Sequence, residues 1–374
     1  MMLRKFSVTG YKNFKNESTL DFTQVKNYNF NKECISNGLL GKALIMGPNG
    51  SGKSNLGYAL FDIVYTLTDK TTCFFQKDAQ SFINGNGDSK FATFKYEFQH
   101  GGSVINYEYR KTLPNSLTYE KLTTDGKVIL EFDHEKNCLL PISDLGMVNG
   151  EKLRLDGRDG SLSIVRFIAN NTIQEENSPI VFLMDFVSRM LYFKSTQDGN
   201  MFIGLERAGD DVESYFVRNG LVEDFERFLR EYAELEVKLG TTRAPGMPEA
   251  MVQKFKSKSI LFSNVSSSGT KALELFYYWS KRFDKVSLLF IDEFDAYYHF
   301  ELAEKIVRQL FKYSTTQVVL TSHNTSIVSN RVMRPDCYLQ IMNGKISSFS
   351  ESTERELREG HNLEKMLRNG EFNE

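Results

Sequence analysis

The run GPNGSGKS, residues 47–54, constrains the fold of this chain more than any other feature. An apolar, strand-like segment precedes it at residues 43–46, and apolar residues at helical spacing follow it as far as residue 67. This context distinguishes a phosphate-binding loop from a tight turn that only introduces a core helix. The loop amides and the positive end of the helix would surround a phosphate group. The sequence therefore predicts that the chain binds a nucleoside triphosphate.

The residue types in this loop have separate predicted roles. We expect Lys53 to reach the β- and γ-phosphates and Ser54 to hold Mg²⁺. The glycines let backbone N–H groups close around the β-phosphate. The other loop residues predicted to contact the nucleotide are Gly47, Pro48, Asn49, Gly50, Ser51 and Gly52.

Composition and charge exclude several classes of protein. The chain has 46 basic and 48 acidic residues, so no global field draws it toward nucleic acid or membrane. Its four cysteines show no paired spacing, which favours neither a zinc site nor a disulfide framework. Residues 1–14 lack the apolar segment of a secretion signal, and no stretch approaches the roughly eighteen apolar residues of a membrane span. We expect a soluble cytoplasmic protein without membrane contact.

Periodicity divides the 374 residues into three segments, enough for one large domain with an insertion or for two domains. Residues 1–178 are predicted to hold the glycine loop and antiparallel strands, with two strands in residues 5–22, a meander in 91–133 and a loop in 144–160. Residues 179–250 are predicted to be a helical insertion or lid. Its apolar stripe at residues 221–235 favours a core-packed helix over a coiled-coil arm. Residues 251–374 return to an α/β pattern and end in a charged tail.

The run SLLFIDEF, residues 287–294, is a second functional candidate. A continuous apolar run suits a parallel strand buried on both faces, and its acids would emerge at the carboxyl edge of the sheet, where ligands bind. Alone, an apolar strand ending in two acids is a weak signal, but an upstream phosphate loop strengthens it. We expect Asp292 to hold Mg²⁺ and Glu293 to polarise the water that attacks the γ-phosphate.

A further apolar strand, residues 318–320, ends in Thr321, Ser322, His323 and Asn324. A lone histidine beside a strand is usually structural. Because His323 follows one strand after the acidic pair, we expect it to contact the γ-phosphate or the attacking water instead.

The Ser/Gly segment that includes Ser267, Ser268 and Gly269 opens a predicted helix with an apolar face. Free N–H groups at that helix start, with the two hydroxyls, would form an anion site. An ordinary serine helix cap is the simpler alternative. A second phosphate site would be superfluous within one monomer, so we expect it to reach the γ-phosphate held by another copy.

The order of glycine loop, Ser/Gly loop, acidic strand and histidine resembles the ATP-binding cassette ATPase superfamily. The chain looks most like its RecF and SMC branch, in particular the small prokaryotic AAA-type ATPases of phage-defence and abortive-infection operons. The resemblance rests on FSVTGYKNF at residues 6–14, GPNGSGKSN at 47–55, SSSGTK at 266–271, IDEFDAYYH at 291–299, TSHN at 321–324 and GHNLEKML at 360–367. It covers both ends of the chain, and residues 134–250 match only in general layout.

This resemblance implies an ABC-type α/β head with a mixed core sheet, an antiparallel meander and a helical insertion. It also implies ATP and Mg²⁺ as cofactors, Asn55 as a further nucleotide contact, and two subunits that enclose two ATP molecules. Ser267, Ser268 and Gly269 would then act in trans, and residues 295–299 would follow the dimer seam. The usual signature leucine is missing and Ser268 replaces a common glycine, which suggests slow hydrolysis.

Two further family positions are less well marked in the sequence. The glutamine that completes the Mg²⁺ shell is assigned to Gln174, with Asn171 as the alternative. A contact with the nucleotide base is suggested for Tyr11, Lys12 or Phe14.

Several functions are compatible with these residues. The leading hypothesis is an ATP-dependent sensor or switch of a bacterial anti-phage system that controls a separate effector, either a nuclease or a toxin, because only about fifty residues follow His323. The alternative is a RecF-like or Rad50-like repair ATPase that clamps DNA. Lys254, Lys256 and Lys258 would form part of its basic track, although a solvated strand face also explains them. A transporter subunit and a nucleotide-holding scaffold without turnover are the remaining hypotheses.

Overall fold

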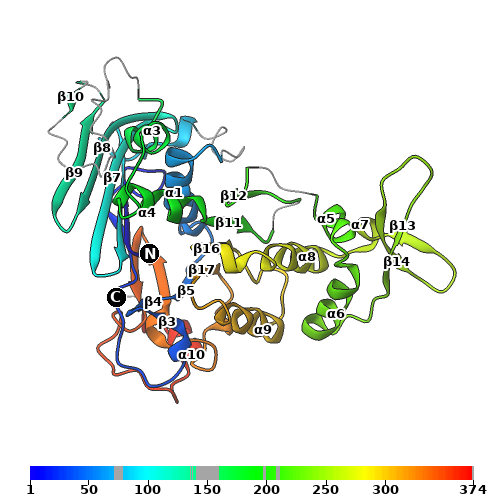
Figure 1. Ribbon diagram of the computed structural model, residues 1–374. Coiled ribbons are helices and arrows are strands. Elements are labelled where there is room, and N and C mark those ends of the chain that lie inside the picture. The colour runs from blue at the N-terminus through cyan, green and yellow to red at the C-terminus, as the bar shows by residue number, and fades with distance from the viewer. Residues whose placement is uncertain are drawn as a thin grey trace.

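The computed structural model describes residues 1–70, 79–134, 136, 138–139, 160–196, 199–207 and 211–372. The loop expected at residues 144–160 lies outside the described residues except for Gly160. Two large sheets, the helices that pack on them and a projecting arm make up the structure (Figure 1). None of the described helices is long and apolar enough to cross a membrane.

The first sheet is antiparallel and forms one end of the molecule (Figure 1). Its strand order is β10-β9-β8-β7-β6-β1-β2. The predicted meander and the predicted pair of opening strands are confirmed, with Phe6 opposite Leu20 in β1 and β2. The strands alternate buried and solvent-facing residues, as expected for a sheet covered on one face. Their bounds are β1 (Met2–Thr9), β2 (Ser18–Asp21), β6 (Ala92–His100), β7 (Ser103–Leu113), β8 (Ser116–Thr124), β9 (Lys127–Asp133) and β10 (Cys138–Leu139).

The second sheet is the mixed core sheet, with the order β12-β11-β16-β17-β5-β18-β19. Its five inner strands are parallel, whereas β12 and β19 are antiparallel edges. All residues of β5, β16 and β17 are buried, which explains their continuous apolar runs. The bounds are β5 (Lys42–Met46), β11 (Leu191–Lys194), β12 (Phe202–Gly204), β16 (Leu288–Asp292), β17 (Gln317–Ser322), β18 (Tyr338–Met342) and β19 (Lys345–Ser348).

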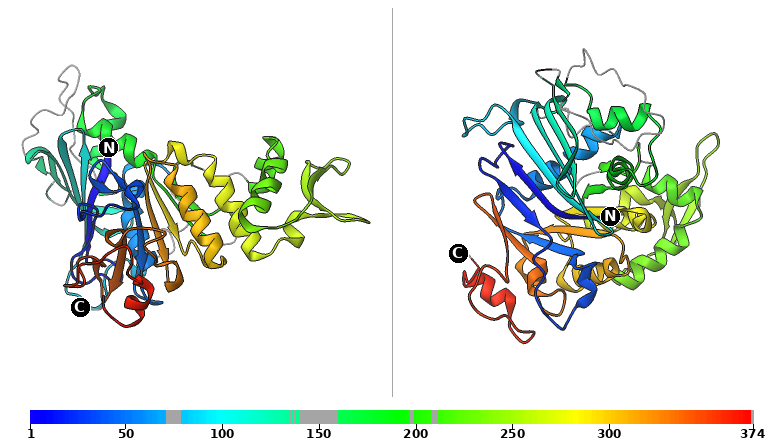
Figure 2. Two further views of the ribbon diagram at one scale, coloured as in Figure 1. Left: turned by 90° about the horizontal axis from the view of Figure 1, so that it is seen from below. Right: turned by 60° about the vertical axis from the view of Figure 1, so that its left-hand side comes forward.

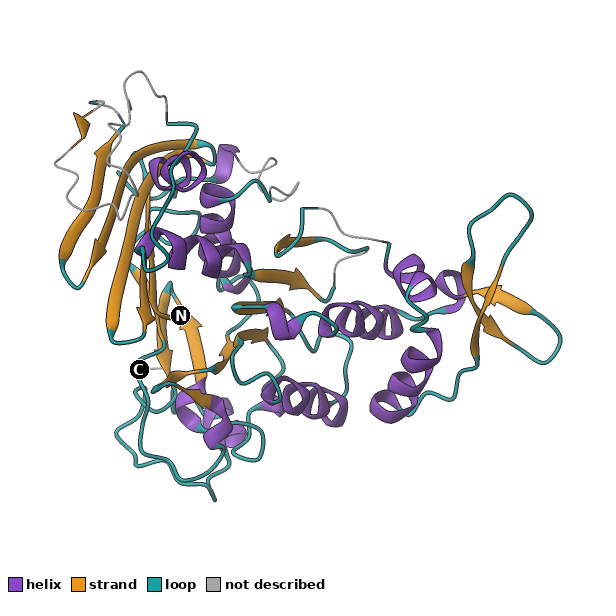
Figure 3. Cartoon of the chain, viewed as in Figure 1, coloured by secondary structure: helices purple, strands orange, loops and turns teal. Residues whose placement is uncertain are grey.

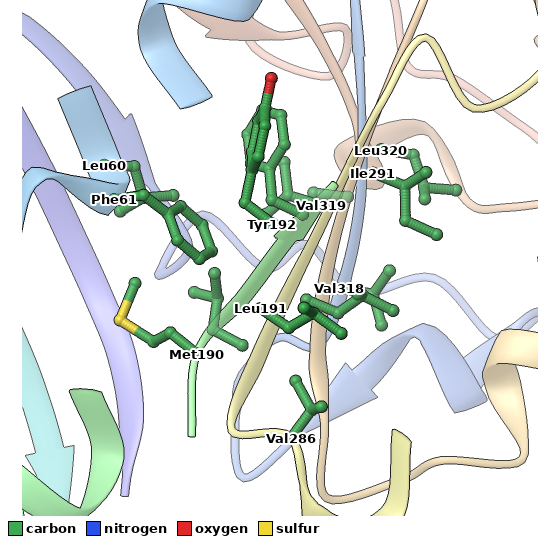
Figure 4. Packing of buried hydrophobic residues seen from close by; sticks show 14 of the residues in the cluster. Leu60, Phe61, Met190, Leu191, Tyr192, Val286, Ile291, Val318, Val319 and Leu320 are labelled. Carbon is green, nitrogen blue, oxygen red and sulfur yellow. The ribbon is translucent and has the colours of Figure 1, made fainter. Parts of the chain in front are cut away.

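Helix α1 (Lys53–Leu67) lies between the two sheets. It follows β5, and α3 (Ile164–Asn171) and α4 (Pro179–Ser188) pack against it. Tyr96 of the antiparallel sheet donates hydrogen bonds to the carbonyls of Ala59 and Leu60 in α1, at 3.1 and 3.2 Å. On its other side, α1 contacts the core sheet, where Phe61 packs with Tyr192 (Figure 4). Helix α1, which begins where the glycine loop ends, is therefore held on both faces.

Helices α8 (Ser268–Ser280) and α9 (Phe300–Phe311) extend from the core sheet toward the arm (Figures 1 and 2). The arm contains α5 (Val212–Arg218), α6 (Val222–Ala233), α7 (Phe262–Val265) and a small sheet of β13 (Leu239–Thr242), β14 (Ala250–Lys254) and β15 (Ser259–Leu261). The stripe predicted at residues 221–235 is confirmed as α6, which packs on α8 and α9. Figure 3 shows the small sheet at the tip of the arm.

The segment expected to be helical, residues 179–250, differs in part from that expectation. It includes β11 and β12, which join the core sheet beside β16. The three apolar residues of β11 are too few to produce a visible period, and pairing with β16 decides their conformation. Lys256 and Lys258 also differ from the expected strand face, because they lie in the turn after β14.

The remaining elements are short. They are β3 (Ile35–Ser36), β4 (Leu39–Leu40), α10 (Leu363–Arg368) and the 3₁₀ helices Lys32–Cys34, Ala79–Ser81, Phe283–Lys285, Thr325–Ile327 and Pro335–Cys337. The expected charged tail thus contains a core strand, β18, which pairs with β5 beside the glycine loop.

Candidate functional site

The glycine loop connects β5 to α1, as the sequence predicts. Gly50 and Gly52 have φ values of 78° and 105°, a left-handed conformation that glycine adopts without strain. A side chain at Gly47 would meet the carbonyl oxygen of Ile341 at 2.8 Å, so β18 also restricts this position to glycine. No side chain caps the N-terminus of α1, which leaves its first N–H groups available to an anion.

Lys53 folds back over this loop. Its ammonium donates hydrogen bonds to the carbonyls of Gly47 at 2.6 Å and Pro48 at 3.0 Å. Burial lowers the pKa of Lys53, while the charges of Asp292 and Glu293 oppose this shift. The lysine is thus a partly desolvated cation held at the mouth of the loop, where it can exchange carbonyl contacts for phosphate oxygens.

Asp292 ends β16 and is fully buried. Its carboxylate accepts hydrogen bonds from Ser54 Oγ at 2.7 Å, from Thr321 Oγ1 at 2.6 Å and from the Tyr192 hydroxyl at 3.2 Å. Tyr192 and Thr321 lie on β11 and β17, the two parallel neighbours of β16, so side chains from all three strands meet at the carboxyl end of β16. The structure therefore joins the two residues that the sequence assigns to Mg²⁺.

Glu293 follows Asp292 with φ at 50°, which turns the chain out of the strand. Its backbone N–H donates to Thr321 Oγ1 at 2.8 Å, and its side chain accepts from Thr196 Oγ1 at 2.9 Å. Lys194 Nζ lies 3.3 Å from Glu293 Oε1. Burial acts to raise the pKa of Glu293, but hydrogen bonds from Thr196 and Lys194, with the charges of Lys194 and His323, lower it overall. The carboxylate is therefore ionised at neutral pH.

Lys194 and Thr196 are site residues that the sequence analysis missed. Lys194 ends β11 directly opposite Asp292, and its ammonium lies 3.7 Å from that carboxylate. The charges of Asp292 and Glu293 raise the pKa of Lys194 against the effect of burial. The sequence contains one signal for this strand, the apolar triplet before Lys194. The surrounding segment has helical periodicity, which hides that signal.

His323 follows β17 and is exposed to solvent. Its neighbour Ser322 donates a 2.8 Å hydrogen bond to Asp295. Burial raises the pKa of Asp295 to about 6, and the nearby charge of His323 acts in the opposite direction. His323 thus lies close enough to both Glu293 and Asp295 to influence their ionisation.

Ser267 caps helix α8, and its Oγ accepts a 3.2 Å hydrogen bond from the N–H of Thr270. Ser267 and Ser268 are exposed. Gly269 lies close to the backbone of Tyr297, and a Cβ atom at position 269 would be 3.4 Å from the carbonyl oxygen of Tyr297. Tyr297 itself is 45% exposed. The cap explains the local role of Ser267. The contact of this helix start with a second copy stays a prediction.

Gln174 lies in the α3–α4 connection, where it hydrogen-bonds with Thr172 and Ser178. Asn171 donates to the carbonyl of Phe167 in α3. Among the described residues, no hydrogen bond joins either side chain to Ser54 or Asp292. Both assignments to the Mg²⁺ shell therefore stay without structural support.

The three residues suggested to contact the nucleotide base differ in how far they are buried. Tyr11 and Phe14 are 2% and 1% exposed, and the Tyr11 ring packs against Phe82 and Phe94. Lys12 is half-buried, with its ammonium over the rings of Tyr11 and Tyr58. Of these three side chains, Lys12 alone is accessible to a ligand.

Other loop residues have defined surroundings. Asn55 donates a 2.7 Å hydrogen bond to Asn13 from the β1–β2 connection. Pro48, Asn49 and Gly50 are exposed. Ser51 Oγ is buried without a hydrogen-bond partner among the described residues, so it is free to bond a group that enters the loop.

Comparison with known proteins supports a family assignment. The family described as "AAA domain, putative AbiEii toxin, Type IV TA system" matches residues 43–329, a span that includes the glycine loop, the serine helix and the acidic strand. No curated protein sequence matches the chain.

Among solved structures, the chain is similar to an SMC head domain from Thermotoga maritima, with 16% identity, a TM-score of 0.42, and coverage of 93% of this chain and 98% of that chain. It is also similar to an SMC head bound to the C-winged-helix domain of ScpA, with 15% identity, a TM-score of 0.46, and coverage of 93% and 97%. The match to an SMC head with an extended coiled coil, bound to the C-terminal domain of ScpA derived from Pyrococcus furiosus, has 13% identity, a TM-score of 0.45 and 98% coverage of each chain.

The family match covers well over half of the chain and includes both halves of the candidate nucleotide site. This chain therefore belongs to the AAA-domain family that is described as putative AbiEii toxin, Type IV TA system, in agreement with its predicted resemblance to small prokaryotic AAA-type ATPases.

Proposed function

We propose that the chain binds ATP with Mg²⁺ at the glycine loop and hydrolyses it to ADP and phosphate. The observation that carries this proposal is the 2.7 Å hydrogen bond between Ser54 and Asp292, with Glu293 as the next residue. Hydroxyl and carboxylate oxygens are the hard ligands that Mg²⁺ prefers. When bound, Mg²⁺ neutralises charge on the β- and γ-phosphates. Lys53 and the uncapped N-terminus of α1 supply the remaining positive charge.

Glu293 is the proposed general base. Its ionised carboxylate can accept a proton from a water at the γ-phosphate, while Thr196 and Lys194 hold its orientation. Lys194 also reduces the repulsion between the neighbouring carboxylates of Asp292 and Glu293. His323 is exposed beside this pair, and its ring nitrogens can form hydrogen bonds. We assign it to contact with the γ-phosphate or with the attacking water.

A second copy of the chain is proposed to complete the site. Ser267 and Ser268 are exposed at the start of a thirteen-residue helix, and Tyr297 is exposed beside them. In trans, these hydroxyls and the N–H groups of the first helical turn would contact the γ-phosphate of the partner's nucleotide. Association as a homodimer or a larger homo-oligomer would then depend on ATP.

The proposed biological role is that of a sensor or switch in a bacterial anti-phage system, acting on a separate effector such as a nuclease or toxin. The family description, which names a putative toxin and a toxin–antitoxin system, supports a role of this kind. The arm, with its small sheet at the tip, offers a surface for a partner protein (Figure 1). We expect the ATP-bound assembly to hold the effector and hydrolysis or invader recognition to release it.

A DNA clamp is the second candidate function, supported by a group of three lysines near the tip of the arm. Lys254, Lys256 and Lys258 are exposed around the turn between β14 and β15. Contacts with phosphates would make binding to duplex DNA fall steeply as salt rises.

Two measurements test these proposals. Phosphate release should require Mg²⁺ and stop when the metal is chelated, and light scattering should show a larger assembly with ATP than without it. Absence of both effects would contradict the enzyme proposal. Duplex binding with and without ATP, at two salt concentrations, separates the clamp from the switch. A pulldown from native cells in ATP, and after its removal, identifies the effector by mass spectrometry.

A further inference from the structure

A polar cleft of about 610 Å³ opens between the start of α8, the loop after β11 and the N-terminus of α5. Its volume lies in the range of pockets that hold small ligands. Ser268 and Thr196 lie on its wall, so the cleft is next to the nucleotide site, but its polar lining is acidic rather than phosphate-binding. Asp211, Glu213 and Glu274 contribute carboxyl groups, whereas Lys271 is the one cation among the described residues of the lining.

Glu274 is the most unusual of these residues. It lies in the middle of α8, it is only 7% exposed, and it lines the cleft. Its Oε1 has no hydrogen-bond partner among the described residues. Burial, followed by the charges of Glu213 and Asp211, raises the pKa of Glu274 to about 8. A buried carboxyl group without a partner needs either a proton or a cation to offset its desolvation.

Glu213, on the facing helix α5, is half-buried and accepts a backbone hydrogen bond from Ser263. Burial and the charge of Asp211 raise the pKa of Glu213 to about 7, against the opposing charge of Lys271. Among the described residues, no ion pair within 4.0 Å joins Lys271 to any of the three acids. Once its acids are ionised, the described lining of the cleft carries more negative than positive charge, which opposes binding of a nucleotide or a phosphate there.

The geometry points to a binding site for an organic cation in this cleft, with Glu274 and Glu213 as the carboxylates that receive an ammonium or guanidinium group. A metal ion fits less well, because among the described residues no group of three His, Cys, Asp or Glu side chains is arranged to hold one. The roomy cleft and its amide and hydroxyl lining, which includes Asn200 and Thr196, suit a larger ligand with several N–H donors. Binding at this site does not depend on ATP hydrolysis.

Two sources could supply such a group: a free diamine or guanidine, and the arginine or lysine side chain of a partner polypeptide. We would titrate agmatine and, separately, Nα-acetyl-arginine methylamide into the full chain without nucleotide, using calorimetry. Tighter binding of agmatine would assign the site to a free cation, and tighter binding of the capped arginine would assign it to a partner's side chain. Either result supports the cation site.

Variants and pH make this test specific. Glu274→Gln should weaken binding of the cation by about tenfold or more, because a charge-assisted hydrogen bond is lost. Lys271→Gln should tighten binding by removing a repulsive charge, and Glu301→Gln, which changes an exposed acid of α9, should leave it unchanged. Binding should release protons and become tighter from about pH 6.5 to about pH 8.5, because the cation displaces the proton of Glu274.

Three results would overturn the assignment. They are equal binding by the parent chain and Glu274→Gln, saturable binding of Mg²⁺ or Ca²⁺ at the cleft in place of the organic probes, and no binding of either probe at low salt. If the parent chain had no ATPase activity, the proposed function would be contradicted but the cation site would not, so the two failures can be told apart.

Discussion

The Ser54 hydroxyl donates a 2.7 Å hydrogen bond to the Asp292 carboxylate and so joins the first turn of α1 to the end of β16. The two residues are far apart in the sequence and meet because β5 and β16 both pair with β17 in the parallel core sheet. Thr321 on β17 reinforces this junction by bonding to Asp292 and to the N–H of Glu293. The candidate catalytic carboxylate is therefore fixed relative to the glycine loop.

Glu293→Gln should lower phosphate release by about 10²–10⁴-fold while ATP binding is retained, because the amide cannot accept the proton of the attacking water. Turnover and nucleotide affinity are measured on the same preparation. Glu301→Gln is the matched control, since Glu301 is exposed on α9. Unchanged turnover in Glu293→Gln would remove Glu293 from the catalytic role.

Ser268→Glu should abolish ATP-dependent association but leave nucleotide binding by the single chain intact. The new carboxylate would face the γ-phosphate of the partner's nucleotide, whereas a glutamate in the first turn of α8 does not harm the helix itself. Light scattering and equilibrium binding of ATP measure the two effects. Ser257→Glu, at an exposed serine near the arm tip, is the control. An ATP-dependent assembly that persists in Ser268→Glu would place the subunit contact elsewhere.

Lys111→Met should destabilise the fold by about 3–5 kcal/mol, because it leaves Asp62 of α1 as an uncompensated buried charge. The two side chains are 2% and 0% exposed, and their charged atoms lie 2.7 Å apart. Lys95→Met breaks the exposed pair with Glu17 and should cost less than about 1 kcal/mol. Urea unfolding of both variants makes the comparison. Equal effects would show that the buried pair does not hold α1 on the antiparallel sheet.

The contribution of Glu274 to the free energy of unfolding should fall as pH rises from about 4.5 to about 8. Burial raises the pKa of Glu274 in the folded chain to about 8, above the ordinary glutamate value of 4.5, so in this interval the unfolded chain releases its proton first. Glu274→Gln should remove this slope and stabilise the chain at the alkaline end by a few kcal/mol, since each pKa unit corresponds to about 1.4 kcal/mol. Urea unfolding across this pH range checks the slope. A slope that is the same in the variant would contradict the burial argument.

The sequence predicted those parts of the site that local patterns encode. The glycine loop between β5 and α1, the buried strand before Asp292 and the antiparallel meander were each predicted, because continuous or alternating apolar runs report burial on two faces or on one. The α/β fold class is confirmed.

Other parts depend on tertiary pairing that a local pattern does not encode. Strand β11 has only four residues, and its position beside β16, which brings Lys194 to Asp292, comes from long-range hydrogen bonding. Gln174 was assigned by its position along the chain, yet its amide bonds locally to Thr172 and Ser178. Likewise a contact with the nucleotide base was suggested for Tyr11 or Phe14 as well as Lys12, but the rings of Tyr11 and Phe14 are buried in the core.

A crystal structure of Glu293→Gln with ATP and Mg²⁺ is the most direct test of the central claim. The account predicts the triphosphate in the loop of residues 47–54, Mg²⁺ on Ser54 beside Asp292, and Ser267 and Ser268 of a second copy at the γ-phosphate. A nucleotide bound elsewhere, or a serine helix facing solvent with no second copy at the γ-phosphate, would contradict it.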